Sequence, residues 1–308
     1  MKRILVLLTA ALAVAGCSSK KTLTAGQYFH EASGNFQDGS YSLAIEQFHD
    51  LLDQFPFSPY SDEAELRIAH GQYLYANYAE AIVAFNDFQR RHPTSPHLPF
   101  VGYSIGMCYA KQIGSIDRDQ SAAQNAENAF MKVIQQYPDS PYAELARVEV
   151  AACRRNIAEH ELYIAKYYAR HRRDKAAEIR LLMLATRYAD TEAAAEGLLR
   201  LAELYRREKR DDRTALVYAV LQRNHPKSAH TVAGRRRFKS LTPVDDLPEG
   251  QDPLDLLLAA NGRQRGIGAT EIVRVPGLEP ATARPLGGGP GTPGFAPPLD
   301  PFGHGRAH

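Results

Sequence analysis

The 308-residue sequence contains only three cysteines and lacks the residue patterns of common metal and nucleotide sites. Three cysteines are too few for a disulfide scaffold. There is no His-Glu-x-x-His and no Cys-x-x-Cys, and the glycine run at 287–291 lacks the Lys-Ser/Thr of a phosphate loop. The histidines are scattered singly, and no ordered Ser/His/Asp set stands out. We therefore expect no enzyme activity, no metal and no cofactor.

No stretch alternates apolar and polar residues, so we expect no β-sheet and an all-α fold. From Pro141 to Arg170 apolar residues recur at the helical period without a glycine or a further proline, which predicts one long helix. A short break near Asn156 to Glu159 is the alternative that the sequence leaves open.

A small residue followed four positions later by a bulky one recurs five times. In four of the copies a proline stands eight positions after the bulky residue. The bulky positions lie 37, 45, 51 and 37 residues apart, so every spacing exceeds the roughly 34 residues of a tetratricopeptide repeat. The copies are Ala44/Phe48/Pro56, Ala81/Phe85/Pro93, Ala126/Phe130/Pro138, Ala177/Leu181/Ala189 and Thr214/Tyr218/Pro226.

This spacing is typical of helices that pack closely in pairs. The small residue lets the partner helix approach, the bulky residue fills the space beside it, and proline ends the helix. The pattern predicts a tetratricopeptide (TPR) solenoid of about five helical hairpins within residues 25–240. The expected units are about 25–58, 62–95, 98–140, 141–190 and 192–228.

Residues 1–16 have the basic start, apolar run and small final residues of a secretory signal. A buried core helix is the alternative, but the terminal position and Cys17 speak against it. Val14-Ala15-Gly16-Cys17 resembles the lipobox of bacterial lipoproteins, which implies cleavage before Cys17 and stable anchoring by several acyl chains. Ser18, rather than Asp, implies sorting to the outer membrane. Residues 17–24 are then a lipidated tether.

Cys108 and Cys153 remain in the mature chain, on predicted first helices of neighbouring units. An oxidising periplasm would allow them to pair. We favour two buried free thiols, because small residues commonly fill the cores of such repeats, and the disulfide stays the alternative.

Residues 241–308 are dense in Pro and Gly, a composition that cannot bury enough apolar surface to offset the entropy of ordering it. We expect this tail to be disordered. Leu254 to Ala260 (LDLLLAA) is an exception that can form one or two helical turns as a docking peptide.

Lys and Arg outnumber Asp and Glu by 19 to 9 between Lys166 and Lys239. Such a basic end suits an acidic partner domain or anionic lipid headgroups. Nucleic acid is not expected, because the lipobox places the chain in the cell envelope. A solvated face is the alternative for each cluster. The clusters are Arg170 with Arg172 and Arg173, Arg206-Arg207 with Lys209-Arg210, and Arg235-Arg236-Arg237 with Lys239.

First helices of a TPR array line a concave groove, and aromatic residues there suit an extended or helical peptide. In the repeat numbering the groove positions include Phe29, Ser33 and Phe36 in the first unit. Those of the second include Leu66, His70 and Tyr73. The alternative is that Phe29 and Phe36 only pack against neighbouring helices.

Several features together resemble the YfiO (ComL) family, the BamD lipoprotein subunits of the outer-membrane β-barrel assembly machine. They are the lipobox, the five units, the turn Phe55-Pro56-Phe57-Ser58-Pro59-Tyr60, Asp117-Arg118-Asp119 and the stretch Tyr163 to Arg170 (YIAKYYAR). The likeness covers about residues 17–230. Ala189 in place of proline, and the long Pro/Gly tail, depart from the family pattern. The first departure is expected to loosen the junction between the fourth and fifth units.

The resemblance implies a lipid-anchored scaffold that faces the periplasm. Its later units would hold the periplasmic domains of the barrel subunit BamA, which makes Arg180, Arg172 and Arg173 candidates. Arg180 also lies on a packing helix beside Leu181 and Leu182, where a role in a paired interface is plausible.

The early units would receive unfolded outer-membrane proteins, which makes Phe29, Phe36, Leu66 and Tyr73 candidates for a client groove. Other lipoproteins of the machine are further implied partners. The alternatives are another periplasmic TPR lipoprotein, such as a secretin pilot or a coordinator of a cell-envelope complex, and a lipoprotein enzyme. The last would need clustered ionisable groups in the groove, which the sequence does not indicate.

Overall fold

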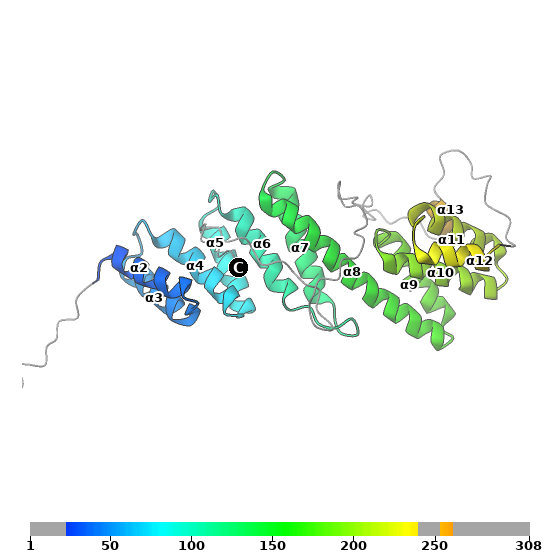
Figure 1. Ribbon diagram of the computed structural model, residues 1–308, viewed down its shortest axis with the longest axis horizontal. Helices are drawn as coiled ribbons and strands as arrows, with labels where there is room; N and C mark the ends of the chain where they lie inside the picture. Colours follow the sequence, from blue (N-terminus) through cyan, green and yellow to red (C-terminus); the bar gives the residue numbers. More distant parts are fainter. Residues whose placement is uncertain (1–22, 240–252, 261–308) are drawn as a thin grey trace, which may run out of the picture. The chain divides into compact units, whose positions relative to one another are not determined.

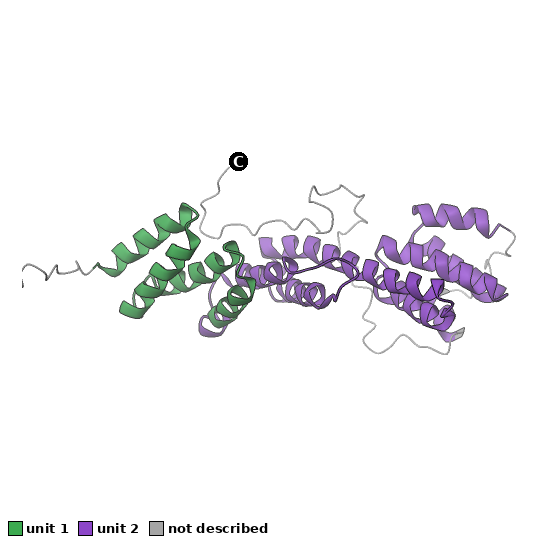
Figure 2. Cartoon of the chain, turned by 90° about the horizontal axis from the view of Figure 1, so that it is seen from below, with its two compact units in different colours: residues 1–88 green, residues 89–308 purple. Residues whose placement is uncertain are grey.

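The computed structural model describes residues 23–239 and 253–260, and every regular element in these ranges is an α-helix (Figure 1). The all-α class is confirmed. The chain divides into two compact units, Met1–Phe88 and Gln89–His308 (Figure 2). The predicted signal peptide, Cys17 and most of the tail lie outside the described residues, and the predicted domain boundaries stay a prediction.

The first unit is built from helical hairpins. Thr24 caps the first helix through a capping box, in which its side chain accepts a hydrogen bond from the backbone of Gln27 and the Gln27 side chain accepts one in return. Gly39 turns the chain in the left-handed conformation, with φ of 79°. The helices are α2 (Ala25–Gln37), α3 (Tyr41–Gln54), α4 (Ser61–Leu74) and α5 (Tyr78–Arg91), which continues past the end of the unit.

The second unit continues the pattern of consecutive helices that pack against each other. The predicted long helix forms without a break near Asn156, as the 30-residue α8. The helices are α6 (Leu98–Ala110), α7 (Ser121–Gln136), α8 (Pro141–Arg170), α9 (Asp174–Arg187), α10 (Glu192–Arg207), α11 (Asp211–Asn224), α12 (Ala229–Arg237) and α13 (Pro253–Ala260).

The recurring pair of small and bulky residues forms the core, as predicted. All five small residues are fully buried, and so are Phe48, Phe85 and Phe130. The bulky residue of the fourth copy, Leu181, is 2% exposed, and Tyr218 of the fifth is half-buried. The recurring pair of small and bulky residues in the sequence therefore marks the buried face of each second helix.

Two glycines of α6 let α7 approach closely. A Cβ built on Gly106 would lie 2.4 Å from the ring of Phe130, and one built on Gly102 would lie 2.9 Å from the side chain of Val133. The bulky residue of the third copy thus occupies the space that a side chain at position 106 would need.

The turn between α9 and α10 is well fastened, contrary to the expectation that Ala189 loosens this junction. Thr191 Oγ1 donates to the carbonyl of Tyr188 (2.7 Å) and accepts from the backbone of Ala194 (3.3 Å). Arg154 of α8 reaches the same turn. Its guanidinium donates to both carboxylate oxygens of Asp190 (2.7 and 3.0 Å) and to the carbonyl of Arg187 (2.6 Å).

Two short helices follow the fifth unit. The sequence analysis did not predict α12, where Gly234 and Phe238 pack against the ring of Tyr218. It did allow a docking helix at 254–260, and α13 packs on α11 with Leu254, Leu257 and Leu258 buried. Both helices cover apolar surface at the end of the array, as a terminal cap of a repeat protein must.

Cys108 and Cys153 are free and buried, as favoured from the sequence. Burial raises the pKa of the Cys108 thiol to about 12, and burial also raises the pKa of Cys153. Thiols with such pKa values stay protonated at neutral pH and act as small apolar core residues.

Candidate binding surfaces

The predicted groove residues Phe29 and Phe36 are half-buried and belong to an aromatic cluster of the first unit. Phe29 stacks on Tyr60, with ring centroids 4.9 Å apart. Phe36 meets Tyr41 edge-on at 5.4 Å, and both phenylalanines contact the buried ring of Phe48. Each thus packs in the hairpin and still shows part of its ring at the surface, so both interpretations of these residues retain support.

Arg67 lies between the two phenylalanines and was missed by the sequence analysis. Its guanidinium lies 5.5 Å from the ring centroid of Phe29 and 5.8 Å from that of Phe36. Glu63, one turn earlier on α4, accepts from its Nε and Nη2 at 2.9 and 2.8 Å. The Glu-x-x-x-Arg spacing beside the groove position Leu66 was the available signal.

The other two predicted groove residues are not surface residues. Leu66 is 0% exposed and Tyr73 is 6% exposed, and His70, which stacks on Tyr73, is 5% exposed. Because their side chains are packed inside the protein, a client could touch them only if the helices moved. The repeat numbering did not indicate that these positions of α4 are buried.

The three basic residues assigned to the partner side differ in their surroundings. Arg180 is partly exposed and donates to Glu161 of α8 at 2.8 Å, with 36% of its side-chain surface accessible. Arg172 and Arg173 are exposed in the turn between α8 and α9. The φ of Arg172 is 57°, the left-handed turn position that Gly39 holds in the first hairpin. The backbone therefore holds both turn residues at the surface.

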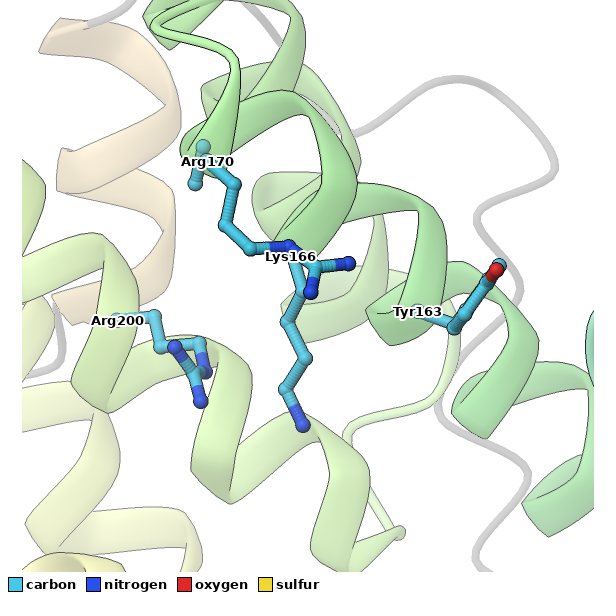
Figure 3. A pocket seen from close by; sticks show the side chains of 5 residues that line it. Tyr163, Lys166, Arg170 and Arg200 are labelled. Carbon is cyan, nitrogen blue, oxygen red and sulfur yellow. The ribbon is translucent and has the colours of Figure 1, made fainter.

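A basic cavity of about 490 Å³ lies near these residues on the second unit (Figure 3). Tyr163, Lys166, Ala169 and Arg170 line it from α8, and Arg200 lines it from α10. Lys166 and Arg200 share one carboxylate, that of Glu196, at 2.6 and 2.7 Å. Burial opposes ionisation of Glu196, but hydrogen bonds from Lys166 and Arg200 hold its pKa below the usual value. Lys166 and Arg200 share the single charge of Glu196, and Arg170 adds a third cation to the lining, so the cavity has an excess of positive charge that suits an anionic group.

Other residues of the basic clusters take part in ion pairs within the second unit. Arg207 donates to Asp174 at 2.7 Å, and Arg210 to Glu208 at 2.8 Å. The buried Glu178 accepts from the hydroxyl of Tyr205 at 2.8 Å. The solvated-face interpretation is thus incomplete for the second cluster, because some of its charges join α9, α10 and α11.

The described residues offer no catalytic arrangement. No group of three or more His, Cys, Asp or Glu in this part of the chain could hold a metal ion. Gly102 to Gly106 reads Gly-x-Ser-x-Gly, but Ser104 is fully buried inside α6 rather than exposed at a strand-to-helix turn.

A family model described as YfiO, an outer membrane lipoprotein, matches residues 21–219 of the sequence. The chain belongs to the YfiO family. The match spans all four helices of the first unit and, in the second, reaches into α11. A second model, the prokaryotic membrane lipoprotein lipid attachment site, matches residues 1–18 of this YfiO-family chain and includes Cys17. The chain is therefore a lipid-anchored outer-membrane lipoprotein.

Curated relatives of this YfiO-family chain carry the name "Outer membrane protein assembly factor BamD". The protein from Pasteurella multocida is 29% identical over 227 residues, which cover 70% of this chain and 87% of that protein. The protein from Vibrio cholerae is 31% identical over 204 residues, which cover 62% and 85%. A solved TPR protein from Thermus thermophilus is 19% identical and covers 71% of this chain and 98% of that one, at a TM-score of 0.33 too low to carry an argument.

Within residues 23–239 and 253–260, none of the helices combines the length and the apolar character needed to cross a bilayer.

Proposed function

We propose that this YfiO-family lipoprotein is a scaffold subunit of the outer-membrane β-barrel assembly machine that acts by binding and without turnover. The observation that carries the proposal is the family match over residues 21–219, together with relatives named as outer-membrane protein assembly factors. The acyl chains on Cys17 hold the chain at the outer membrane, and its helical hairpins face the periplasm.

The second unit is the proposed contact for the periplasmic domains of BamA. Arg172 and Arg173 lie in the turn between α8 and α9, and Arg180 lies on α9. The basic cavity is lined by Lys166 and Arg170 of α8 and by Arg200 of α10. Arg180 is the best-placed of the three arginines because Glu161 holds its guanidinium in one direction while about a third of its side-chain surface remains accessible. A preorganised arginine loses little entropy when it meets a partner carboxylate.

The first unit is the proposed contact for unfolded outer-membrane protein clients. Phe29 and Phe36 are partly exposed, and the guanidinium of the buried Arg67 lies over both rings. Two partly exposed aromatic rings suit an extended peptide that carries aromatic side chains. Leu66 and Tyr73 support this surface from below rather than touch the client.

Replacing Arg180 with glutamate is expected to weaken capture of the BamA periplasmic domains about tenfold or more. The change removes one charge-assisted hydrogen bond and adds a like charge to the face that the partner's carboxylate meets. Affinity would be measured by titrating the purified periplasmic domains onto the purified lipoprotein. Circular dichroism checks that helix content is kept.

Lys132→Glu is the matched control, because Lys132 is exposed on α7 of the same unit and the charge change is identical. The double variant Arg180→Glu/Glu161→Arg restores the ion pair within the chain with reversed charges. Recovery of BamA binding in the double variant would mean that Arg180 acts only by holding α9 to α8. Unchanged binding in the single variant would remove Arg180 from the interface.

A further inference from the structure

The turn between α3 and α4 presents an uncharged apolar tip to solvent. Phe57 at its apex is 99% exposed, and Pro56 and Pro59 on either side are exposed as well. Tyr60 is 36% exposed, and no charged residue occurs from Phe55 to Ser61. A fully exposed phenylalanine between two prolines costs solvation free energy, so a surface that covers it is expected.

The turn is held rigid by its own hydrogen bonds. The backbone of Ser58 donates to the carbonyl of Phe55, and that of Ser61 to the carbonyl of Ser58, both at 3.1 Å. Ser61 Oγ donates to the carbonyl of Phe55 at 3.1 Å, and the hydroxyls of Ser58 and Ser61 are 3.0 Å apart. Because the loop is already ordered, burying Phe57 in an apolar environment requires little further loss of backbone entropy.

The turn lies beside the start of α2, where the chain arrives from the lipidated cysteine. Tyr28 Oη accepts from Gln54 at 2.8 Å, and its ring lies 6.1 Å from that of Phe55. A Cβ built on Gly26 would lie 3.5 Å from the hydroxyl of Tyr60. The end of the first hairpin that carries Phe57 is thus the end at which α2 begins.

The length of chain before α2 limits how far the turn can be from the bilayer. Seven residue steps separate Cys17 from Thr24, and a fully extended chain spans at most about 3.3–3.6 Å per residue, so roughly 25 Å in all. Because acyl chains on Cys17 fix one end in the membrane, the start of α2, which the turn contacts through Tyr60 and Phe55, stays within about 25 Å of the lipid surface.

We propose that Phe57, flanked by Pro56 and Pro59, inserts into the interface of the periplasmic leaflet of the outer membrane as a second membrane contact. Aromatic side chains favour this boundary between headgroups and acyl chains, and one lipid-anchored site plus one inserted ring fixes an orientation that a flexible tether alone does not. The contact would hold the first hairpin with its α3–α4 end toward the lipid.

The test uses the absence of tryptophan from the sequence. Phe57→Trp creates a single tryptophan, which can be excited selectively over the 16 tyrosines, at the apex of the turn in the full, acylated chain. The protein is reconstituted in vesicles of phosphatidylethanolamine and phosphatidylglycerol, with and without lipids brominated in the acyl chains. Tyr75→Trp is the matched control, because Tyr75 is 53% exposed and follows the last residue of α4. The 14-residue helix places it about 20 Å from the turn.

We expect the emission of the Phe57→Trp variant to shift to shorter wavelength on reconstitution and to fall at least twofold with brominated lipids. The emission maximum of the Tyr75→Trp control should stay at the wavelength of solvent-exposed indole. Brominated lipids should reduce its intensity only slightly. Emission of position 57 that is unchanged by lipid, or equal quenching at both positions, overturns the proposal. So does a shift at position 57 that appears only when an unfolded outer-membrane protein is added, because that result assigns the turn to clients instead.

Discussion

Replacing Arg154 with alanine is expected to lower the free energy of unfolding by about 2–3 kcal/mol, since hydrogen bonds to charged groups contribute about 1.5–3 kcal/mol each and solvent screens part of the effect. Arg154 joins three elements. Its guanidinium binds Glu127 of α7 at 3.1 Å and Asp190 in the turn between α9 and α10 at 2.7 Å, and it covers the ring of Tyr188 at 5.3 Å. Arg154 and Glu127 are about one-fifth exposed and Asp190 39%. Urea unfolding followed by circular dichroism measures the loss.

The control for this prediction is Arg147→Ala on the same helix. Arg147 pairs with Glu144 one turn earlier on α8, and Glu144 is 76% exposed, so a change below about 0.5 kcal/mol is expected. Arg154→Lys keeps the charge but loses the planar fork that meets both Asp190 oxygens, so it should restore only part of the stability. Equal effects of the Arg147 and Arg154 variants would show that the three-element contact does not stabilise the unit.

Gly106→Ala is expected to destabilise the hairpin of α6 and α7 by about 2 kcal/mol. The added methyl group would lie 2.4–2.9 Å from three atoms of the Phe130 ring, and a close-packed core answers such overlap with off-rotamer side chains that cost about 1–3 kcal/mol. The intrinsic helix preference of alanine offsets about 1 kcal/mol at most. Hydrogen exchange in α6 and α7 should accelerate, and the urea midpoint should fall.

Gly34→Ala is the matched control in α2, because no atom lies within 4 Å of the position where its Cβ would be. There only the helix preference acts, and the variant should gain roughly 0.5–1 kcal/mol. If alanine stabilised the protein at both positions, the close approach of Phe130 to α6 would not hold in solution.

The second helices were predictable because their sequence period and their packing have one cause. A helix that packs closely needs a small residue where the backbones meet and a bulky one a turn later, so Ala44 and Phe48 carry their burial in their spacing. The ends followed from Pro56 and its equivalents. At Ala189 the helix still ends at Arg187 without proline, because Thr191 and Arg154 satisfy the exposed carbonyls.

The candidate surfaces were harder to predict because they depend on contacts between distant residues. Arg154 lies 27 residues from Glu127 and 36 from Asp190, and no local pattern relates those positions. The burial of Leu66 could not be predicted for a similar reason. Its repeat position does not indicate which neighbouring residues cover its side chain. Helix α12 was missed because its apolar residues are few and Arg235 to Arg237 gave the stretch a polar character.

Affinity purification of the Cys17-acylated chain from envelope extracts of its native cell, followed by identification of the co-purifying proteins, tests the assembly function most directly. The proposed function predicts that the BamA-type barrel subunit is the dominant partner, that other lipoproteins of the machine accompany it, and that Arg180→Glu reduces its recovery while Lys132→Glu does not. A preparation dominated by a secretin or by cell-wall enzymes, with the barrel subunit absent, would contradict the proposed function.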